Sequence, residues 1–211
     1  MHTFYVPATD DTPIIFLPAT EMHHAIHVLR LAAGEKIQLI DGTGNLYVAE
    51  IIEAGKKTCG VKILSKQFIS KQWHFHLHIA IAPTKSTDRF DFFVEKVTEM
   101  GIDEITPLLC QNSERKKINI EKEKLTLLAA VKQSGKTFLP KFSELITFEK
   151  FITDLRGHPV SKYIAYCSNE HKIELSEAYK SKQNALILIG PEGDFKKEEI
   201  ELAIKNNFTP V

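Results

Sequence analysis

Hydrophobic and polar positions follow two different patterns along this chain, and the pattern changes near residue 70. Before that point, short apolar stretches alternate with turn residues at regular spacing, which is typical of small β-rich domains. We expect strands at residues 4–6, 14–16, 36–40, 46–53 and 58–64. Thr20 is placed to cap a short helix over residues 21–29. The N-terminal part is therefore predicted to form a small β-barrel.

From residue 73 onward, predicted strands alternate with amphipathic helices. The strands cover residues 74–82, 105–109, 163–166 and 186–189, and the helices cover 87–100, 120–133, 149–155 and 195–205. Such alternation is typical of a mostly parallel sheet with helices on both faces. We therefore predict an α/β protein of two domains, residues 1–70 and 73–211.

The stretch from Leu186 to Asp194 carries the clearest indication of a binding site. Four apolar residues in a row predict a strand that is buried on both faces, and a loop with two glycines ends it abruptly. The carboxyl end of such a strand is where open α/β sheets bind ligands. Glycines leave the main chain accessible, so backbone groups can hold a small molecule. An ordinary strand-to-helix turn, with Asp194 opening the helix, explains the same spacing.

Charge and cysteine content bear on three properties: nucleic-acid binding, disulfide bonds and metal sites. The 27 Lys and Arg residues balance 27 Asp and Glu residues, so any nucleic-acid binding must come from local basic clusters. The 3 cysteines stand far apart, which favours a reduced cytoplasm without disulfides or structural zinc. His74, His76 and His78 alternate along a strand without a fourth ligand at suitable spacing, so no metal is expected.

Membrane and targeting segments are also not expected. No apolar run in the sequence approaches the roughly 18 residues that a membrane-spanning helix needs. The N-terminus lacks the basic start and apolar core of a signal peptide. We therefore expect a cytoplasmic protein with no membrane partner.

Four polar side chains are candidates for contacts with a nucleic acid or another ligand. Arg30 ends the predicted short helix, and Arg115 lies in a basic loop that follows a strand. Gln133 and Lys136 close a predicted helix and are suited to a base edge or a phosphate. Each position has an ordinary explanation too, as a helix end or a solvated charge. Hydrolase, kinase and dehydrogenase motifs do not occur in the sequence.

Taken in chain order, several short motifs resemble one family over nearly the whole chain. That family is the RsmE-type 16S ribosomal RNA uridine methyltransferases of the SPOUT superfamily. The matching positions are His27-Val28-Leu29-Arg30, Asp41-Gly42, Lys96, Glu99-Met100-Gly101, Ile105-Thr106-Pro107-Leu108, Ser113-Glu114-Arg115, Gln133-Ser134-Gly135-Lys136, Ile189-Gly190-Pro191-Glu192-Gly193 and Glu198-Glu199-Ile200. Each motif alone is weak, whereas the ordered set is specific.

The resemblance implies a fold, an activity and a set of site residues. It implies an N-terminal PUA-like β-barrel, a C-terminal SPOUT domain of the trefoil-knot type, and a homodimer. It implies transfer of a methyl group from S-adenosylmethionine to N3 of a uridine in 16S ribosomal RNA of the small ribosomal subunit, without a metal. The cofactor would be held by Cys167, Ile189, Gly190, Pro191, Glu192 and Gly193, and the RNA by Arg30, Arg115, Gln133 and Lys136.

Two features depart from the family pattern, one residue and one segment. Lys136 stands where members commonly carry arginine, which keeps the charge but weakens bidentate recognition. The resemblance also implies a strand from about Phe208 and a further segment beyond Val211, where we expect the catalytic residues. Two alternatives stay open: an RNA-binding protein that is catalytically incomplete, and a SPOUT methyltransferase that acts on a different RNA.

Overall fold

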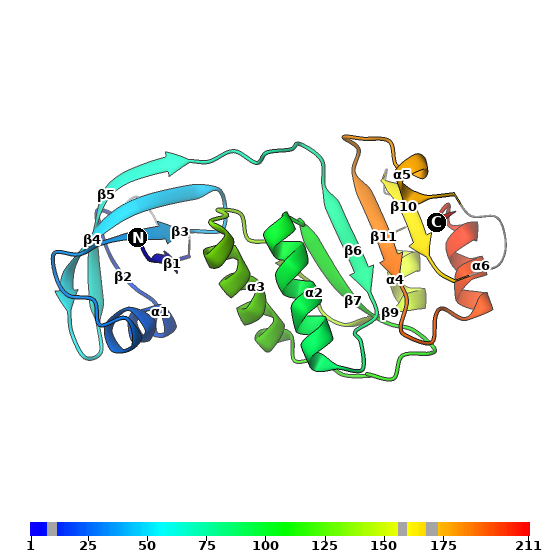
Figure 1. Ribbon diagram of the computed structural model, residues 1–211, viewed down its shortest axis with the longest axis horizontal. Coiled ribbons are helices and arrows are strands. Elements are labelled where there is room, and N and C mark those ends of the chain that lie inside the picture. Colours follow the sequence, from blue (N-terminus) through cyan, green and yellow to red (C-terminus); the bar gives the residue numbers. More distant parts are fainter. Residues whose placement is uncertain (8–11, 156–159, 168–172) are drawn as a thin grey trace. The chain divides into compact units, whose positions relative to one another are not determined.

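The computed structural model describes residues 1–7, 12–155, 160–167 and 173–211. These residues form two compact units (Figure 1). The first consists of Met1–Gln72 and Leu128–Leu139, and the second of Trp73–Leu127 and Pro140–Val211. The chain thus returns to the first unit after the second has begun, which the hydrophobic pattern does not indicate. Among the described residues, no helix is both long and apolar enough to cross a membrane.

The first unit is built on a five-stranded sheet with the order β1-β3-β4-β5-β2. Its strands are β1 Thr3–Tyr5, β2 Ile14–Phe16, β3 Lys36–Ile40, β4 Asn45–Ala54 and β5 Cys59–Phe68. The pairs β3–β4 and β4–β5 are antiparallel, whereas β1 runs parallel to β3. Alternating residues such as Phe4, Leu39 and Ile51 form the core beneath the sheet. The strands predicted for this part of the chain are confirmed.

The helix predicted over residues 21–29 has a different form. α1 covers Ala19–His23 and continues into one wider, π-helical turn, η1, at His24–Val28. The prediction of a Thr20 cap was wrong, because Pro18 precedes the helix and no side chain caps it. Arg30 ends the segment in a left-handed conformation with φ 56°. Both π-helical turns and left-handed non-glycine residues are concentrated at functional sites.

Residues 128–139 attach to the first unit through a helix end and a loop. α3 spans Ile120–Ser134. Near its end, Lys132 Nζ donates to Glu21 Oε1 of α1 at 2.8 Å, and the Glu21 side chain is almost fully buried. After the helix, Thr43 and Phe138 form an isolated antiparallel bridge. A buried ion pair and backbone pairing therefore hold this returning segment.

The second unit contains a seven-stranded parallel sheet with the order β12-β10-β11-β6-β7-β8, and β9 also pairs with β7. The strands are β6 Leu77–Ile81, β7 Glu104–Leu109, β8 Lys141–Phe142, β9 Ile146–Thr147, β10 Ser161–Ala165, β11 Ala185–Ile189 and β12 Thr209–Pro210. The helices are α2 Thr87–Met100, α4 Phe148–Asp154, α5 Leu175–Ala178 and α6 Lys197–Lys205. The predicted parallel sheet flanked by helices is confirmed.

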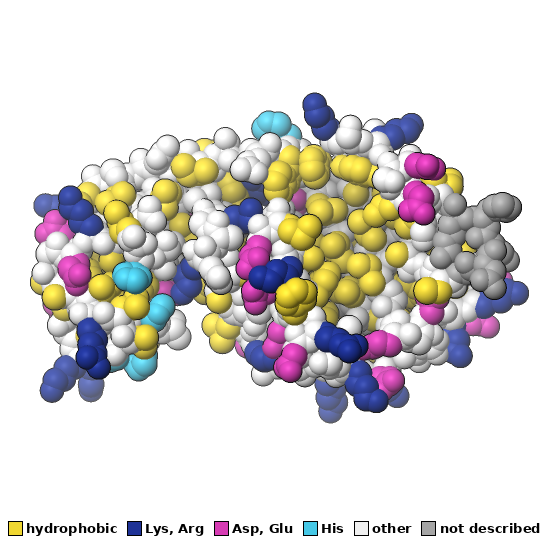
Figure 2. All heavy atoms as spheres, in the orientation of Figure 1, with side chains coloured by type: hydrophobic (Ala, Val, Ile, Leu, Met, Phe, Trp, Pro, Cys, Tyr) yellow, Lys and Arg dark blue, Asp and Glu magenta, His cyan; other side chains and the backbone are white. Residues whose placement is uncertain are grey.

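The two faces of the central strand β11 differ in how well they are covered. Leu186 and Leu188 belong to a core that α4 and α6 close with Phe148 and Ala203. On the opposite face Ala185 is buried, but Ile187 and Ile189 are only half-buried. Figure 2 shows hydrophobic side chains gathered over β6 and β11. The prediction of burial on both faces was therefore wrong for one face, because the helices of the described chain cover it only in part.

Two glycines with similar backbone angles allow a test of packing in the first unit. At Gly44, with φ +106°, an added Cβ would lie 2.5 Å from Phe138 Cζ and 2.6 Å from Phe68 Cε2. At Gly34, with φ +93°, an added Cβ would meet nothing within 4 Å. We predict that Gly44→Ala lowers the free energy of unfolding by about 2–3 kcal/mol and Gly34→Ala by about 1 kcal/mol. Chemical denaturation measures both, and equal losses would contradict a role for the two rings.

Candidate functional site

The carboxyl ends of three neighbouring strands meet at one edge of the second unit's sheet. β11 lies between β6 and β10 and is parallel to both. Ile189, at the end of β11, stands opposite Ala165 of β10 and Ile81 of β6. The loops that follow these strands therefore leave the sheet side by side, as the general rule for ligand sites in α/β sheets requires.

The loop after β11 is a tight turn. The Asp194 amide donates to Pro191 O at 2.9 Å, which leaves Glu192 and Gly193 exposed at the tip. The atoms nearest to an added Cβ at Gly193 belong to the Asn112 side chain, at 3.4 Å or more. At Gly190 the same atom would lie 3.0 Å from the Phe195 ring. A side chain at Gly190 would thus press on the Phe195 ring, whereas Gly193 is the glycine that keeps main chain accessible.

Other loops hold this turn in place through hydrogen bonds. The Cys167 amide, just after β10, donates to Asp194 Oδ2 at 2.7 Å. The Lys85 amide, just after β6, donates to Glu192 Oε1 at 2.9 Å. Cys167 and the loop 190–193, which the family resemblance assigns to one cofactor site, are therefore directly linked by the neighbouring Asp194.

The loop after β7 adds a third attachment that the sequence analysis did not identify. Asn112 Nδ2 donates to the carbonyl oxygens of Gly193 and Asp194, at 2.9 and 3.0 Å. Asn112 follows the carboxyl end of a parallel strand, so the rule that singled out the β11 loop also applies to it. The turn is therefore anchored by the loops after β6, β7 and β10.

Helix α6 begins at Lys197, two residues later than the predicted start at Phe195, so Asp194 does not open it. Asp194 lies in the preceding loop in a left-handed conformation with φ 60°. The buried Glu199 carboxylate instead closes the helix start, because it accepts from the Lys196 amide and the Gln111 amide, each at 2.9 Å. Asp194 is thus available to bond other loops.

The Arg115 side chain is largely buried in the second unit, although its place in a basic loop predicts an exposed side chain. Its side chain is only 16% exposed, and its NH2 group lies 3.9 Å from Oε1 of Glu123, which is fully buried. The guanidinium also lies over the Phe90 ring, 5.8 Å from its centroid. Among the described residues, neither Glu123 oxygen nor the NH1 group of Arg115 has a hydrogen-bond partner. The arginine is thus held beside a buried carboxyl group.

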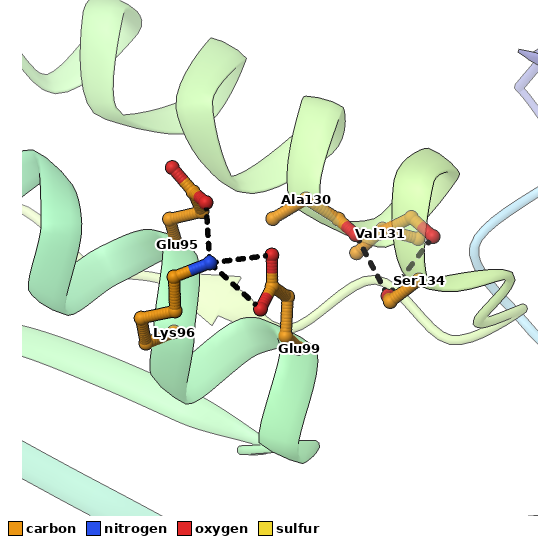
Figure 3. Close-up of polar contacts among 6 residues, drawn as sticks. All are labelled: Glu95, Lys96, Glu99, Ala130, Val131 and Ser134. Atoms are coloured by element: carbon orange, nitrogen blue, oxygen red, sulfur yellow. Dashed lines mark hydrogen bonds and ion pairs between the residues drawn. The ribbon is translucent and has the colours of Figure 1, made fainter.

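The other three RNA candidates belong to the first unit. Arg30 and Gln133 are exposed, and Lys136 is half-buried. The turn after α3 is a regular helix end, since Gly135 has φ +68° and the Lys136 amide donates to Val131 O at 3.1 Å. Figure 3 shows the Ser134 hydroxyl directed back to the carbonyls of the preceding turn, with Ala130 O at 2.7 Å. The backbone at this helix end is therefore explained by ordinary helix termination.

Lys96, another motif position, serves its own helix. Its Nζ lies 2.7 Å from Glu95 Oε1 and 3.0 Å from both oxygens of Glu99 (Figure 3). These bonds to the two carboxylates raise the pKa of Lys96 and keep it charged. The two carboxylates balance the positive charge of Lys96. These ion pairs within the helix account for a lysine at this position without a bound ligand.

One partly buried histidine and one buried cysteine of the second unit are uncharged at neutral pH. Burial lowers the pKa of His78 to about 4, and its Nε2 lies 2.9 Å from Thr106 Oγ1. Burial also raises the pKa of the Cys110 thiol to about 12. Within the described part of the chain, no three His, Cys, Asp or Glu residues are grouped so that they could hold a metal ion.

Known proteins match both units. The family described as RNA methyltransferase domain matches residues 71–211, and the RNA methyltransferase PUA domain matches residues 17–64. The chain belongs to the RsmE-type RNA methyltransferases. The predicted family, the fold class with its PUA-like N-terminal domain, and the RNA methyltransferase activity are confirmed, as is S-adenosylmethionine as the cofactor of this family.

Alignments with individual relatives span most of this chain. Ribosomal RNA small subunit methyltransferase E of Rickettsia conorii is 27% identical over 86% of this chain and 73% of its own length. A probable rRNA-methyltransferase of Porphyromonas gingivalis has 34% identity and a TM-score of 0.89, covering 100% of this chain and 88% of its own. A methyltransferase of Legionella pneumophila, solved with bound SAM, has 25% identity and a TM-score of 0.87, covering 99% and 87%.

The buried Glu123 makes stability depend on pH. Burial raises the pKa of Glu123 to about 7, and the nearby Asp91 carboxylate adds to this effect. The unfolded chain releases the same proton near the ordinary value of 4.5. Between these values the folded state binds more protons, so the free energy of unfolding falls as pH rises from about 4.5 to 7.

Glu123→Gln tests this dependence, because the amide cannot ionise. We predict that it raises the free energy of unfolding at pH 8 by about 1–3 kcal/mol and leaves it nearly unchanged at pH 4. Glu121→Gln, on the exposed side of the same helix, is the control and is expected to change little at either pH. Urea denaturation across this range measures the effect. If the free energies of unfolding of Glu123→Gln and the parent protein differ by the same amount at every pH, ionisation of Glu123 is not the cause of the pH dependence.

Proposed function

We propose that this enzyme methylates N3 of a uridine in 16S ribosomal RNA, with S-adenosylmethionine as the methyl donor. The observation that carries this proposal is the convergence of three loops on the turn 190–194 at the carboxyl edge of the parallel sheet. Relatives named as small-subunit ribosomal RNA methyltransferases support the RNA class. The uridine and its N3 atom come from the motif resemblance.

The cofactor site in this proposal is the main chain of Ile189–Gly193, with Cys167 beside it. The residues fit such a ligand, because the turn is held by hydrogen bonds from outside it and Gly193 is exposed. Fixed backbone donors and acceptors can recognise the adenosyl group without a charged side chain. When bound, S-adenosylmethionine supplies an activated methyl group on a sulfonium, and the protein's task is to hold it in line with the acceptor.

The methyl acceptor needs help from the protein. Uridine N3 carries a proton and is a weak nucleophile at neutral pH, so its proton must be removed or its anion stabilised. The Cys110 thiol, with a pKa of about 12, cannot accept this proton at neutral pH. Arg115 is the cation that we propose to orient the base or a phosphate, since Glu123 and Phe90 hold its guanidinium in one position.

Methyl transfer with identified products tests the proposal. The protein is incubated with labelled S-adenosylmethionine and 16S ribosomal RNA in small subunits, and the modified nucleosides are identified by mass spectrometry. We expect 3-methyluridine. Binding of RNA without cofactor binding would favour the catalytically incomplete alternative. Methylation of transfer RNA in place of 16S RNA would favour a SPOUT enzyme with a different substrate.

The RNA role of Gln133 and Lys136 is tested by substitution. We predict that Lys136→Ala weakens RNA binding and reduces the salt dependence of the binding constant by about one phosphate contact. Gln133→Ala should weaken binding with little change in salt dependence, because it removes no charge. Cofactor affinity should stay unchanged in both. Lys197→Ala, at an exposed lysine of α6, is the matched control; an equal loss of RNA affinity there would argue against a specific site.

We also propose that two copies associate through the second unit. The half-buried face of β6 and β11 and the exposed α2 residues Phe92 and Met100, at 62% and 76%, support such a contact. Exposed apolar patches of this kind are typical of protein interfaces. Sedimentation equilibrium measures the mass in solution, and a monomer at micromolar concentration would contradict this part of the proposal.

A further inference from the structure

Asp194 adopts a backbone conformation that L-residues rarely adopt. Its φ is 60°, and the tight turn from Pro191 places it there. Glycine fits this conformation without strain, whereas a residue with a Cβ adopts it at a cost in free energy. Aspartate tolerates it better than most residues, but still less well than glycine. The contacts of the Asp194 side chain offset this cost.

Both oxygens of the Asp194 carboxylate are used by backbone amides. Oδ2 accepts from the Cys167 amide at 2.7 Å, and Oδ1 accepts from the Phe195 amide at 2.8 Å. Hydrogen bonds to an ionised carboxylate are stronger than those between neutral groups. The first of them spans two loops, because Cys167 follows β10 and Asp194 follows β11.

The helix that follows does not need this carboxylate. α6 starts at Lys197, and Glu199 supplies the acceptor for the Lys196 amide at its start. Neither Asp194 oxygen accepts from an amide of α6. What aspartate adds over glycine at this position is therefore the link between the β10 and β11 loops.

We infer that Asp194 is a positioning residue for the methyl donor, which sets the distance between the β10 loop at Cys167 and the cofactor turn at Ile189–Gly193. This inference rests on the proposed cofactor site, whose two parts are the ones that Asp194 joins. Without the link, the turn keeps its bonds to Asn112 and Lys85 but loses its connection to Cys167. The affinity for S-adenosylmethionine then falls, while the fold is retained.

Asp194→Gly separates this role from a structural one, because glycine removes the link and the backbone strain together. We expect the variant to have an unfolding midpoint equal to or above that of the parent protein. We expect its affinity for S-adenosylmethionine to fall about tenfold or more, as loss of a charge-assisted hydrogen bond predicts. The KM for the cofactor should rise more than kcat falls, and hydrogen exchange at the Cys167 amide should become faster.

Two further variants serve as comparisons. Asn207→Gly relieves a similar backbone conformation, φ 66° at the end of α6, without touching the cofactor turn. It should match Asp194→Gly in stability and the parent protein in cofactor affinity. Asp194→Asn keeps one acceptor oxygen and a residue that tolerates φ above zero, so its cofactor affinity should lie between those of the parent protein and Asp194→Gly.

Calorimetric titration of the full chain with S-adenosylmethionine, together with thermal unfolding, decides the matter. If the parent protein binds and Asp194→Gly binds within twofold of it, the inference is overturned and the proposed cofactor site stands. A lower unfolding midpoint for Asp194→Gly also overturns it, since the link would then hold the fold. If the parent protein itself does not bind, the proposed function fails at the cofactor and the inference fails with it.

Discussion

Parallel pairing of β11 with β6 and β10 is the constraint on which the candidate site depends. It brings the loops after these strands to one edge, although Lys85, Cys167 and Gly193 are far apart in the sequence. The register of this pairing is set by packing on one face, where Leu186 and Leu188 enter the core beneath α4 and α6. A slip of one residue would turn these side chains to the opposite face. Burial of apolar side chains therefore decides where a polar loop lies.

Polar side chains near that edge hold backbone in place. Asn112 and Glu192 each bond main-chain groups of another loop, and Glu199 joins the β7 loop to the start of α6. Bonds of this kind hold the loops of a ligand site in place before the ligand binds. The loss of conformational entropy on binding is therefore smaller. Arg115 and Glu123 differ from this group, because part of their hydrogen-bonding capacity is unused among the described residues. The second unit thus combines a candidate ligand edge whose polar groups are well bonded with a buried charge pair whose hydrogen bonds are incomplete.

Local sequence patterns predicted most of the strands and helices of this protein correctly. Strands β3, β4, β5, β7 and β11 and helices α2 and α3 were predicted within a few residues, because each depends on the spacing of apolar residues within one segment. The ordered motifs indicated the RsmE family, and the glycine loop after β11 indicated the candidate site. The short strands β8 and β9 were missed, since two residues carry no period of their own.

Features that depend on contacts between distant segments became known only from the tertiary structure. The return of residues 128–139 to the first unit rests on the ion pair of Lys132 with Glu21 and on backbone pairing with the Thr43 segment, neither of which a local pattern encodes. The same holds for the inward position of Arg115 and for the link from Asp194 to Cys167. The sequence by itself determined the elements, the family and the location of the turn. The fold alone decided which polar groups satisfy one another, because hydrogen-bond partners are chosen by distance in space and not by separation along the chain.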